Sequence, residues 1–161
     1  MPAGMTALQA MMLEPLGVAV HAIDLAKPAM FESVCIVGCG PIGLKIIQLC
    51  RLAGVSKVYA VEPLNYRAKA AVAHGADEAV GTPAGVEELT GGRGVDLVIE
   101  ATNSPRAMVD AVSVVRIGGR VVLVGIPDGN QYAAVDASMV RRKAVKIKTS
   151  RRMGDGAPRI A

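Results

Sequence analysis

The sequence predicts an α/β fold in which a doubly wound parallel sheet of about six strands carries helices on both faces. Three observations favour this class. Apolar, β-branched segments alternate with helical segments along the 161 residues, which is typical of βα units. The chain has one Phe, three Tyr and no Trp although 52% of it is hydrophobic, so aliphatic residues must build the core of a covered parallel sheet. A glycine-rich turn at residues 38–43 joins an apolar segment to a helix.

The strands are expected where β-branched and aliphatic residues run together between turn residues. Six such segments occur, at residues 34–37, 57–61, 78–80, 95–101, 120–126 and 144–149. Pro63 and Pro127 mark the ends of the second and fifth segments, since proline cannot donate to a sheet ladder. The alternation with helices implies parallel pairing through right-handed crossovers.

The helices are expected between these strands, at residues 44–53, 66–74, 83–89 and 105–116. Gly54 and Gly75 follow the first two helices as C-cap residues. Ahead of the first strand, residues 7–22 form a further helix that Glu14 and Pro15 interrupt. This helix is almost wholly apolar and carries one carboxylate, which indicates contact with something beyond the sheet.

The turn Gly38-Cys39-Gly40-Pro41-Ile42-Gly43 has the features of a dinucleotide-phosphate cradle. The first glycine permits a tight turn, the second lets the backbone approach a pyrophosphate, and the third lets the helix pack close to the strand. Pro41 suits the first helical position, because its missing N–H costs nothing there. The free N–H groups and the positive end of the helix would face the phosphates, which predicts a Rossmann-type nucleotide site. A glycine turn without a ligand is the alternative interpretation.

Glu62 is the second indication of a cofactor site, at the carboxyl end of the second strand and about 20 residues beyond the glycine turn. A carboxylate there accepts hydrogen bonds from both adenosine ribose hydroxyls and repels a 2′-phosphate, so it predicts NAD rather than NADP. A solvated charge that ends a strand is the alternative. Arg67 lies nearby and either bonds to the ribose 3′-hydroxyl or meets a phosphate, which weakens the exclusion of NADP.

The location is expected to be cytoplasmic, without membrane contact. No uninterrupted apolar run approaches the roughly 20 residues that span a bilayer, and the N-terminus lacks the pattern of a signal peptide. Cys35, Cys39 and Cys50 are odd in number and form no Cys-x-x-Cys pair, so they are expected to be buried thiols rather than a disulfide or metal framework. A lowered pKa is considered for Cys39 alone, because it lies near a helix N-terminus.

Positive charge is concentrated towards the end of a chain whose net charge is +4. The basic residues of this region are Arg141, Arg142, Lys143, Lys146, Lys148, Arg151, Arg152 and Arg159. A nucleic-acid surface is one interpretation. The near absence of aromatic residues for base stacking argues against it. We therefore expect a solvated strand edge whose charge discourages edge-to-edge pairing, and no nucleic-acid partner.

Four segments follow one another in a recognisable order: EPLGVAVHA at 14–22, GCGPIG at 38–43, VDLVIEAT at 95–102 and GGRVVLVG at 118–125. Together they resemble the cofactor-binding domain of zinc-dependent medium-chain dehydrogenases, and are most similar to the sorbitol (polyol) and threonine dehydrogenase branch. The resemblance covers nearly the whole chain. It implies an oxidoreductase in which an alcohol or polyol passes a hydride to NAD.

The resemblance also implies roles for individual residues. Glu14 matches the family glutamate at the edge of the catalytic zinc, which ligates the metal or holds its water. Arg152 resembles the arginine that follows the last strand and points toward the substrate. His21 is a family position too, although a histidine on an apolar helix is more often part of the core. The implied cofactor-binding residues are Gly38, Gly40, Pro41, Ile42, Gly43, Glu62, Arg67, Thr102 and Ile126.

The family's N-terminal catalytic domain, with its Cys and His zinc ligands, has no counterpart in the sequence. Residues 1–30 are therefore expected to form a helical lead-in from that domain, residues 31–152 the dinucleotide-binding domain, and residues 153–161 a truncated C-terminal segment. A catalytic zinc site needs about three protein ligands, so zinc is expected only where the catalytic domain is supplied. The isolated chain is then expected to be inactive.

The preferred interpretation is therefore the NAD-binding domain of a zinc-type alcohol or polyol dehydrogenase. The alternative is a stand-alone, non-catalytic module that binds or senses NAD(H). A methyltransferase on a similar fold ranks lower, because Pro41 and Glu62 suit a dinucleotide better. A homodimer or larger assembly is expected, through the edge strand at 144–149 or an exposed apolar face of the N-terminal helix.

Overall fold

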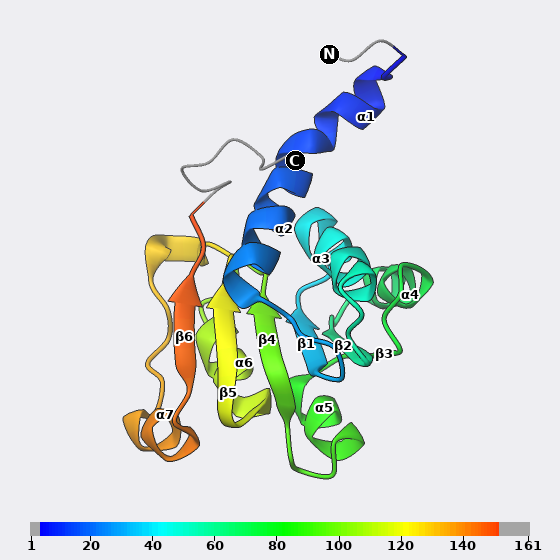
Figure 1. Cartoon of the computed structure of the whole chain (residues 1–161). Coiled ribbons are helices and arrows are strands. Elements are labelled where there is room, and N and C mark those ends of the chain that lie inside the picture. The colour runs from blue at the N-terminus through cyan, green and yellow to red at the C-terminus, as the bar shows by residue number, and fades with distance from the viewer. Residues whose placement is uncertain (1–3, 152–161) are drawn as a thin grey trace.

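The computed structural model describes residues 4–151 and confirms the doubly wound α/β class (Figure 1). All strands are parallel, in the order β3-β2-β1-β4-β5-β6. The strands are β1 Ser33–Val37, β2 Lys57–Val61, β3 Glu78–Val80, β4 Val95–Glu100, β5 Val115–Leu123 and β6 Lys146–Thr149. The strand order reverses between β1 and β4, and this switch point is where α/β sheets of this kind bind ligands at their carboxyl ends.

Helices cover both faces of the sheet. They are α1 Ala7–Met11, α2 Leu13–Ala26, α3 Pro41–Leu52, α4 Asn65–Ala73, α5 Pro83–Leu89, α6 Ala107–Val114 and α7 Ala137–Lys143, with a 3₁₀ turn η1 at Asp128–Asn130. Figure 1 shows α2 and α3 on one side of the central strands and α6 on the other. The fold is therefore a sheet between two helical layers.

Side chains alternate between the two layers along each central strand. In β1, Val34 and Ile36 pack with the buried residues of α2 and α3. Cys35 and Val37 face the other way, towards α5 and α6. This period of two explains why the central strands read as continuous apolar runs, since a covered parallel sheet buries both of its faces.

The predicted bounds of β2, β3 and α5 are confirmed, whereas those of the C-terminal half differ. Strand β5 begins at Val115 rather than at residue 120, because Val95 pairs with Val115 and Leu97 pairs with Arg120. Residues 116–119 therefore form an irregular segment within the strand, although they were expected to precede it. Helix α6 accordingly ends earlier than predicted.

A short helix that the sequence did not indicate, α7, precedes the last strand. The Asp136 side chain caps it by accepting a hydrogen bond from the backbone N–H of Ser138, at 2.7 Å. Ala144 then ends the helix in a left-handed conformation, with φ of 48°. Strand β6 consequently begins at Lys146, two residues later than predicted.

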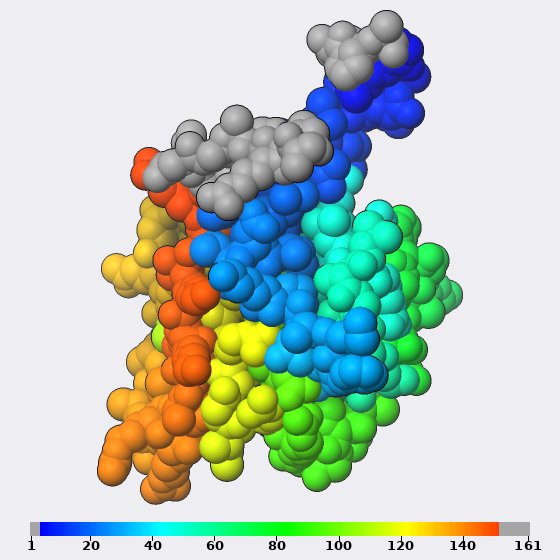
Figure 2. Space-filling model, viewed as in Figure 1, coloured from blue at the N-terminus to red at the C-terminus, as the bar shows by residue number. Residues whose placement is uncertain are grey.

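Helix α1 and the beginning of α2 form an arm that projects from the body of the molecule in Figures 1 and 2, while the rest of α2 packs on it. Helices α1 and α2 together make Ala7–Ala26 long and apolar enough to cross a bilayer, by length and composition alone. Glu14, His21 and Asp24 interrupt this stretch, so it is not the uninterrupted apolar run that the sequence was expected to lack. Within this stretch, Val18, Ala19, Ala22 and Ala26 of α2 are buried.

Asp96 ties three elements together at the amino end of the sheet. Its carboxylate accepts hydrogen bonds from the Ser33 backbone N–H at 2.8 Å and the Ser33 hydroxyl at 2.7 Å, and from Arg93 Nη2 at 2.8 Å. The irregular segment of β5 adds the Nε of Arg116, at 2.5 Å. Burial alone would raise the pKa of Asp96, but these donors outweigh it and hold the pKa well below its usual range.

We expect Asp96→Asn to lower the free energy of unfolding at pH 7 by about 2–3 kcal/mol, because the variant loses a charged acceptor. Since the folded-state pKa of Asp96 is depressed, its contribution is present above the unfolded pKa of about 4 and is lost as the pH falls. Urea unfolding at pH 7 and pH 3 measures both effects. The gap between the variant and the wild type should be smaller at pH 3 than at pH 7, and it should close only as the pH falls through the depressed folded-state pKa. An equal gap at both pH values would contradict the assignment.

Candidate functional site

The glycine turn lies at the switch point and is held by close backbone contacts. Gly38 has a φ of +90°, and its N–H donates to the carbonyl of Val61 at 2.9 Å. A Cβ on Gly38 would overlap the side-chain methyl of Thr102, and one on Gly43 would overlap the carbonyl oxygen of Gly38. The first and third glycines are therefore required by the fold itself.

Gly40 differs from these two, because nothing lies within 4 Å of the position of its Cβ. It caps the 12-residue helix α3, whose first residue is Pro41, as the sequence predicts. Among residues 4–151, the N–H groups of Ile42 and Gly43 have no hydrogen-bond acceptor. Open space, free donors and the positive end of a helix thus meet at one point, an arrangement that fits a pyrophosphate.

Glu62 is buried directly beside this turn, with 5% of its surface exposed. Its Oε2 accepts from the backbone N–H of Cys39 at 2.9 Å, and its Oε1 accepts from that of Leu64 at 3.0 Å. The carboxylate therefore fixes the glycine turn to the end of β2. A carboxylate has about four acceptor positions, so two remain for a ligand.

The thiol of Cys39 is buried in the core beneath the turn. Burial, and secondarily the charge of Glu62, raises the pKa of Cys39 to about 12, while Arg67 acts in the opposite direction. The lowered pKa considered from the sequence is therefore wrong, because desolvation outweighs the helix N-terminus. All three cysteines are buried free thiols, as expected.

Glu100 is a residue of the site that the sequence reasoning missed. It is fully buried at the end of β4, where it accepts from the backbone N–H groups of Thr102 at 2.5 Å and Gly125 at 3.3 Å. Burial raises the pKa of Glu100, although these hydrogen bonds oppose the effect. An acidic residue inside the apolar segment 95–102 was the available signal. Its effect is to join the ends of β4 and β5.

The loops that follow β4 and β5 are joined by hydrogen bonds. Asn103 Nδ2 donates to the Asp128 carboxylate at 3.2 Å, and the Asp128 N–H donates to the Asn103 carbonyl at 2.8 Å. Thr102 lies at the base of the first loop, against Gly38. Ile126 lies at the base of the second, with 74% of its surface exposed. Both residues therefore lie at the carboxyl end of the sheet, near the turn.

The residues expected to act in catalysis are not assembled in the same way. Glu14 is exposed in the first turn of α2, and His21 is half-buried on the same helix. No group of three His, Cys, Asp or Glu side chains that could hold a metal occurs among residues 4–151. Arg152 lies outside the described residues. The part of the chain that the structure describes therefore does not fit a zinc site by itself.

Alanine substitutions at Gly40 and Gly43 test the different roles of these two glycines. Gly43→Ala should lower the free energy of unfolding by at least about 2 kcal/mol, because its methyl group meets the backbone of Gly38. Gly40→Ala should cost no more than about 1 kcal/mol, since its φ of −73° is ordinary and its Cβ meets nothing. Chemical denaturation measures both, with Gly81→Ala, another open position, as the control. Equal losses at positions 40 and 43 would contradict this account of the turn.

Comparisons with known proteins place this geometry in a family context. Residues 41–159 match the family described as zinc-binding dehydrogenase. The L-threonine 3-dehydrogenase of Caldanaerobacter subterraneus is 32% identical over 149 residues, which are 88% of this chain and 42% of that protein. The chain thus spans about two fifths of the length of this curated relative.

Solved structures agree with this result. A short chain alcohol dehydrogenase of Escherichia coli CFT073, complexed with NADH, has a TM-score of 0.82 and 28% identity over 94% of this chain and 46% of its own. A zinc-binding dehydrogenase of Sinorhizobium meliloti 1021, bound to NADP, has a TM-score of 0.77 and 27% identity over 85% of this chain and 42% of its own.

Proposed function

Because this chain belongs to the zinc-binding dehydrogenase family, we propose that it is the NAD-binding part of an alcohol or polyol dehydrogenase. The observation that carries the proposal is the cradle at Gly40, where an open space meets free backbone donors. We assign the cofactor domain to residues 31–152 and a helical lead-in to residues 1–30. The last residues, 153–161, lie outside the described part of the chain.

The residues at the carboxyl ends of the strands supply the cofactor contacts in this proposal. The N–H groups of Ile42 and Gly43, at the positive end of α3, bind the pyrophosphate. Thr102 and Ile126 line the adenosine and nicotinamide sites. When bound, the cofactor supplies a nicotinamide ring that accepts or donates a hydride. This chain's own part is to hold the cofactor in place.

We propose that Glu62 selects NAD over NADP. Its carboxylate is already fixed by the N–H groups of Cys39 and Leu64, so it cannot turn away from a ligand without losing both hydrogen bonds. The ribose hydroxyls would use its remaining acceptor positions, whereas a 2′-phosphate would meet its charge. Arg67, which lies close enough to influence the Cys39 thiol, is assigned to the ribose as well.

Metal chemistry requires ligands from outside the described residues. We propose that Glu14 lies at the edge of a catalytic zinc only in an intact dehydrogenase, and that Arg152 points toward its substrate. The other ligands would come from a catalytic domain like that of the family. We further propose a cytoplasmic protein that forms a homodimer or larger assembly, in which the edge of β6 is one available surface.

A second candidate function is a stand-alone module that binds or senses NAD(H) without catalysis. It is supported by a difference between the cofactor site and the metal site. The open space at Gly40 that we assign to the cofactor lies among the described residues, whereas no group of three side chains that could hold a metal occurs among them. Such a module would need only the first of these features.

Calorimetric titration of the chain with NAD tests the cofactor proposal. We expect binding, and Gly40→Ala should weaken it at least tenfold, because the added methyl group fills the space that the pyrophosphate needs. NADP should bind at least about tenfold more weakly than NAD, and Glu62→Ala should narrow that difference. A chain that does not bind NAD, or a Gly40→Ala variant with unchanged affinity, would contradict the proposal.

An activity assay distinguishes the cofactor domain of a dehydrogenase from a stand-alone NAD(H)-binding module. With zinc and NAD, the 161-residue chain should oxidise sorbitol, threonine and 2,3-butanediol no faster than the background, since its described residues assemble no zinc site. Absorbance of NADH at saturating substrate measures this. A separately supplied catalytic domain of the family should then restore activity. Zinc-dependent oxidation by the chain alone would show that the ligand argument is wrong, and continued inactivity with the added domain would favour the module.

A further inference from the structure

A second concave site lies at the amino end of the sheet, and we propose that it binds a small molecule carrying a phosphate monoester. The cavity has a volume of about 420 Å³, within the range of small-molecule sites. Its walls include Gly92, Arg93, Arg116, Ile117, Arg142 and Lys143. We call it the amino-end pocket.

The amino-end pocket is distinct from the glycine turn. Arg93 precedes β4, Arg116 lies near the start of β5, and Arg142 is in the last turn of α7. Because the strands are parallel, these residues lie at the edge of the sheet opposite to the turn that ends β1. In Figure 1 this is the end of the molecule where α5 and α7 lie.

Three guanidinium groups reach the pocket from three different elements. Asp96 engages two of them through Arg93 Nη2 and Arg116 Nε. The Nη1 atoms of the same two arginines donate to the carbonyls of Gly94 and Ile117. Within residues 4–151, Arg93 Nε and Arg116 Nη2 form no hydrogen bond. These arginines are thus held in place by one carboxylate and still have donors for a ligand.

Arg142 and Lys143 add positive charge to the pocket, but within residues 4–151 only Arg142 has its donors free for a ligand. Arg142 is exposed and forms no hydrogen bond or ion pair within the described residues, so its whole guanidinium is available. Lys143 donates to the carbonyls of Val112 at 3.0 Å and Val115 at 2.8 Å, and also to that of Ser113. It thereby neutralises the negative C-terminal end of α6, which would otherwise repel an anion.

Positive charge therefore exceeds negative charge at the amino-end pocket. The four cations face two carboxylates: Asp96, which the two arginines share, and Glu87, whose charge acts on Lys143. Planar guanidinium groups match the oxygens of phosphate with paired hydrogen bonds. Ile117, 71% exposed, adds one apolar wall for the carbon part of a ligand. These features favour a phosphorylated small molecule.

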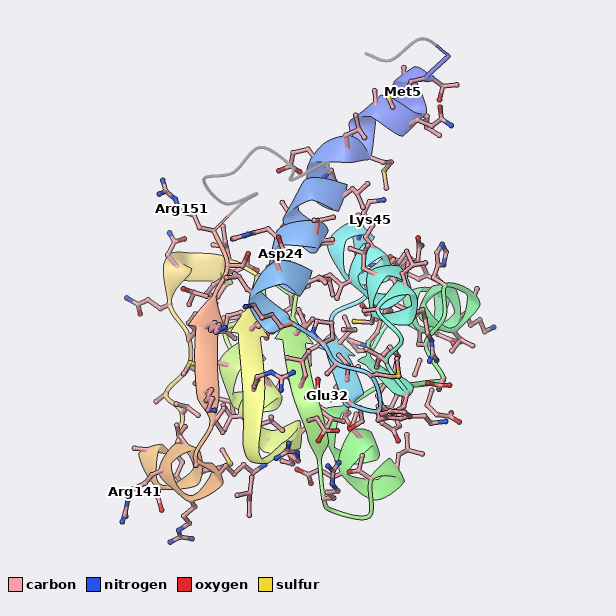
Figure 3. The ribbon with its side chains drawn as sticks, in the orientation of Figure 1. Met5, Asp24, Glu32, Lys45, Arg141 and Arg151 are labelled. Carbon is pink, nitrogen blue, oxygen red and sulfur yellow. The ribbon has the colours of Figure 1, made fainter. Side chains whose placement is uncertain are left out.

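A nucleic acid is a poorer fit to the same features. The pocket wall contains no aromatic side chain on which a base could stack. The basic residues of the C-terminal region also do not form one continuous patch. Figure 3 shows Arg141 at the α7 end of the molecule and Arg151 at the opposite end. The charge that could bind a backbone of phosphates is therefore divided.

The test is a calorimetric titration of the chain with glycerol 3-phosphate and with inorganic phosphate, at constant ionic strength in a phosphate-free buffer. Arg142→Glu is the informative variant, because Arg142 supports no other described residue. Arg141→Glu is its matched control: it makes the same charge change on the same helix, at a residue that does not line the pocket.

We expect wild-type binding in the millimolar range or tighter, with at least a tenfold loss in Arg142→Glu and less than a twofold loss in Arg141→Glu. No measurable binding would overturn the proposal. Equal losses in the two variants would show diffuse surface charge, and unchanged binding in Arg142→Glu would place the phosphate elsewhere, as at the glycine turn. Tighter binding of a short oligonucleotide, weakened by both substitutions, would indicate a nucleic-acid surface instead. None of these outcomes depends on whether NAD binds.

Discussion

The close approach of three backbone segments at the carboxyl end of the sheet is the constraint on which the rest of this structure depends. Gly38 lies against Thr102, Gly43 lies against the carbonyl of Gly38, and Gly125 lies against the carbonyl of Thr102. None of the three glycines has room for a Cβ. Glu100 and Glu62 then lock the assembly with hydrogen bonds to backbone N–H groups, so the open space at Gly40 is bounded by rigid elements.

Charge is used differently at the two ends of the sheet. At the carboxyl end, buried carboxylates accept backbone N–H groups and leave the helix donors of α3 to a ligand. At the amino end and along β6, cations neutralise helix C-termini: Lys143 does so for α6, and Lys148 donates to the Leu25 carbonyl of α2 at 3.1 Å. Lys143 and Lys148 therefore serve the fold, while Lys146 and Lys148 stay exposed on the edge strand β6, as expected of a solvated edge.

The features that could be predicted from the sequence are those fixed by residues close to them in the chain. Strand β2 follows Gly54 and precedes Pro63, so turn residues fixed its bounds. The position of Pro41 was likewise predictable, because proline has few places in a helix. The start of β5 was not, since Val115 pairs with Val95 through a contact 20 residues away in sequence. Long-range burial also decided the pKa of Cys39. For Glu100, the acidic residue within an apolar segment marked the position, but its hydrogen bond to Gly125 joins residues 25 apart in sequence and is not visible locally.

The same difference between local and long-range contacts applies to the proposed chemistry, for which residues 4–151 provide a place for the cofactor but no group that could hold a metal. A cradle needs only backbone donors and space, which one βα unit provides from residues close in sequence. A catalytic metal needs side chains from several directions, and Glu14 stands exposed on an arm with Leu13 and Leu16 beside it, both also exposed. An apolar helix face around a carboxylate is costly in water unless another surface covers it. The arm is therefore where further protein must pack if Glu14 is to meet a metal.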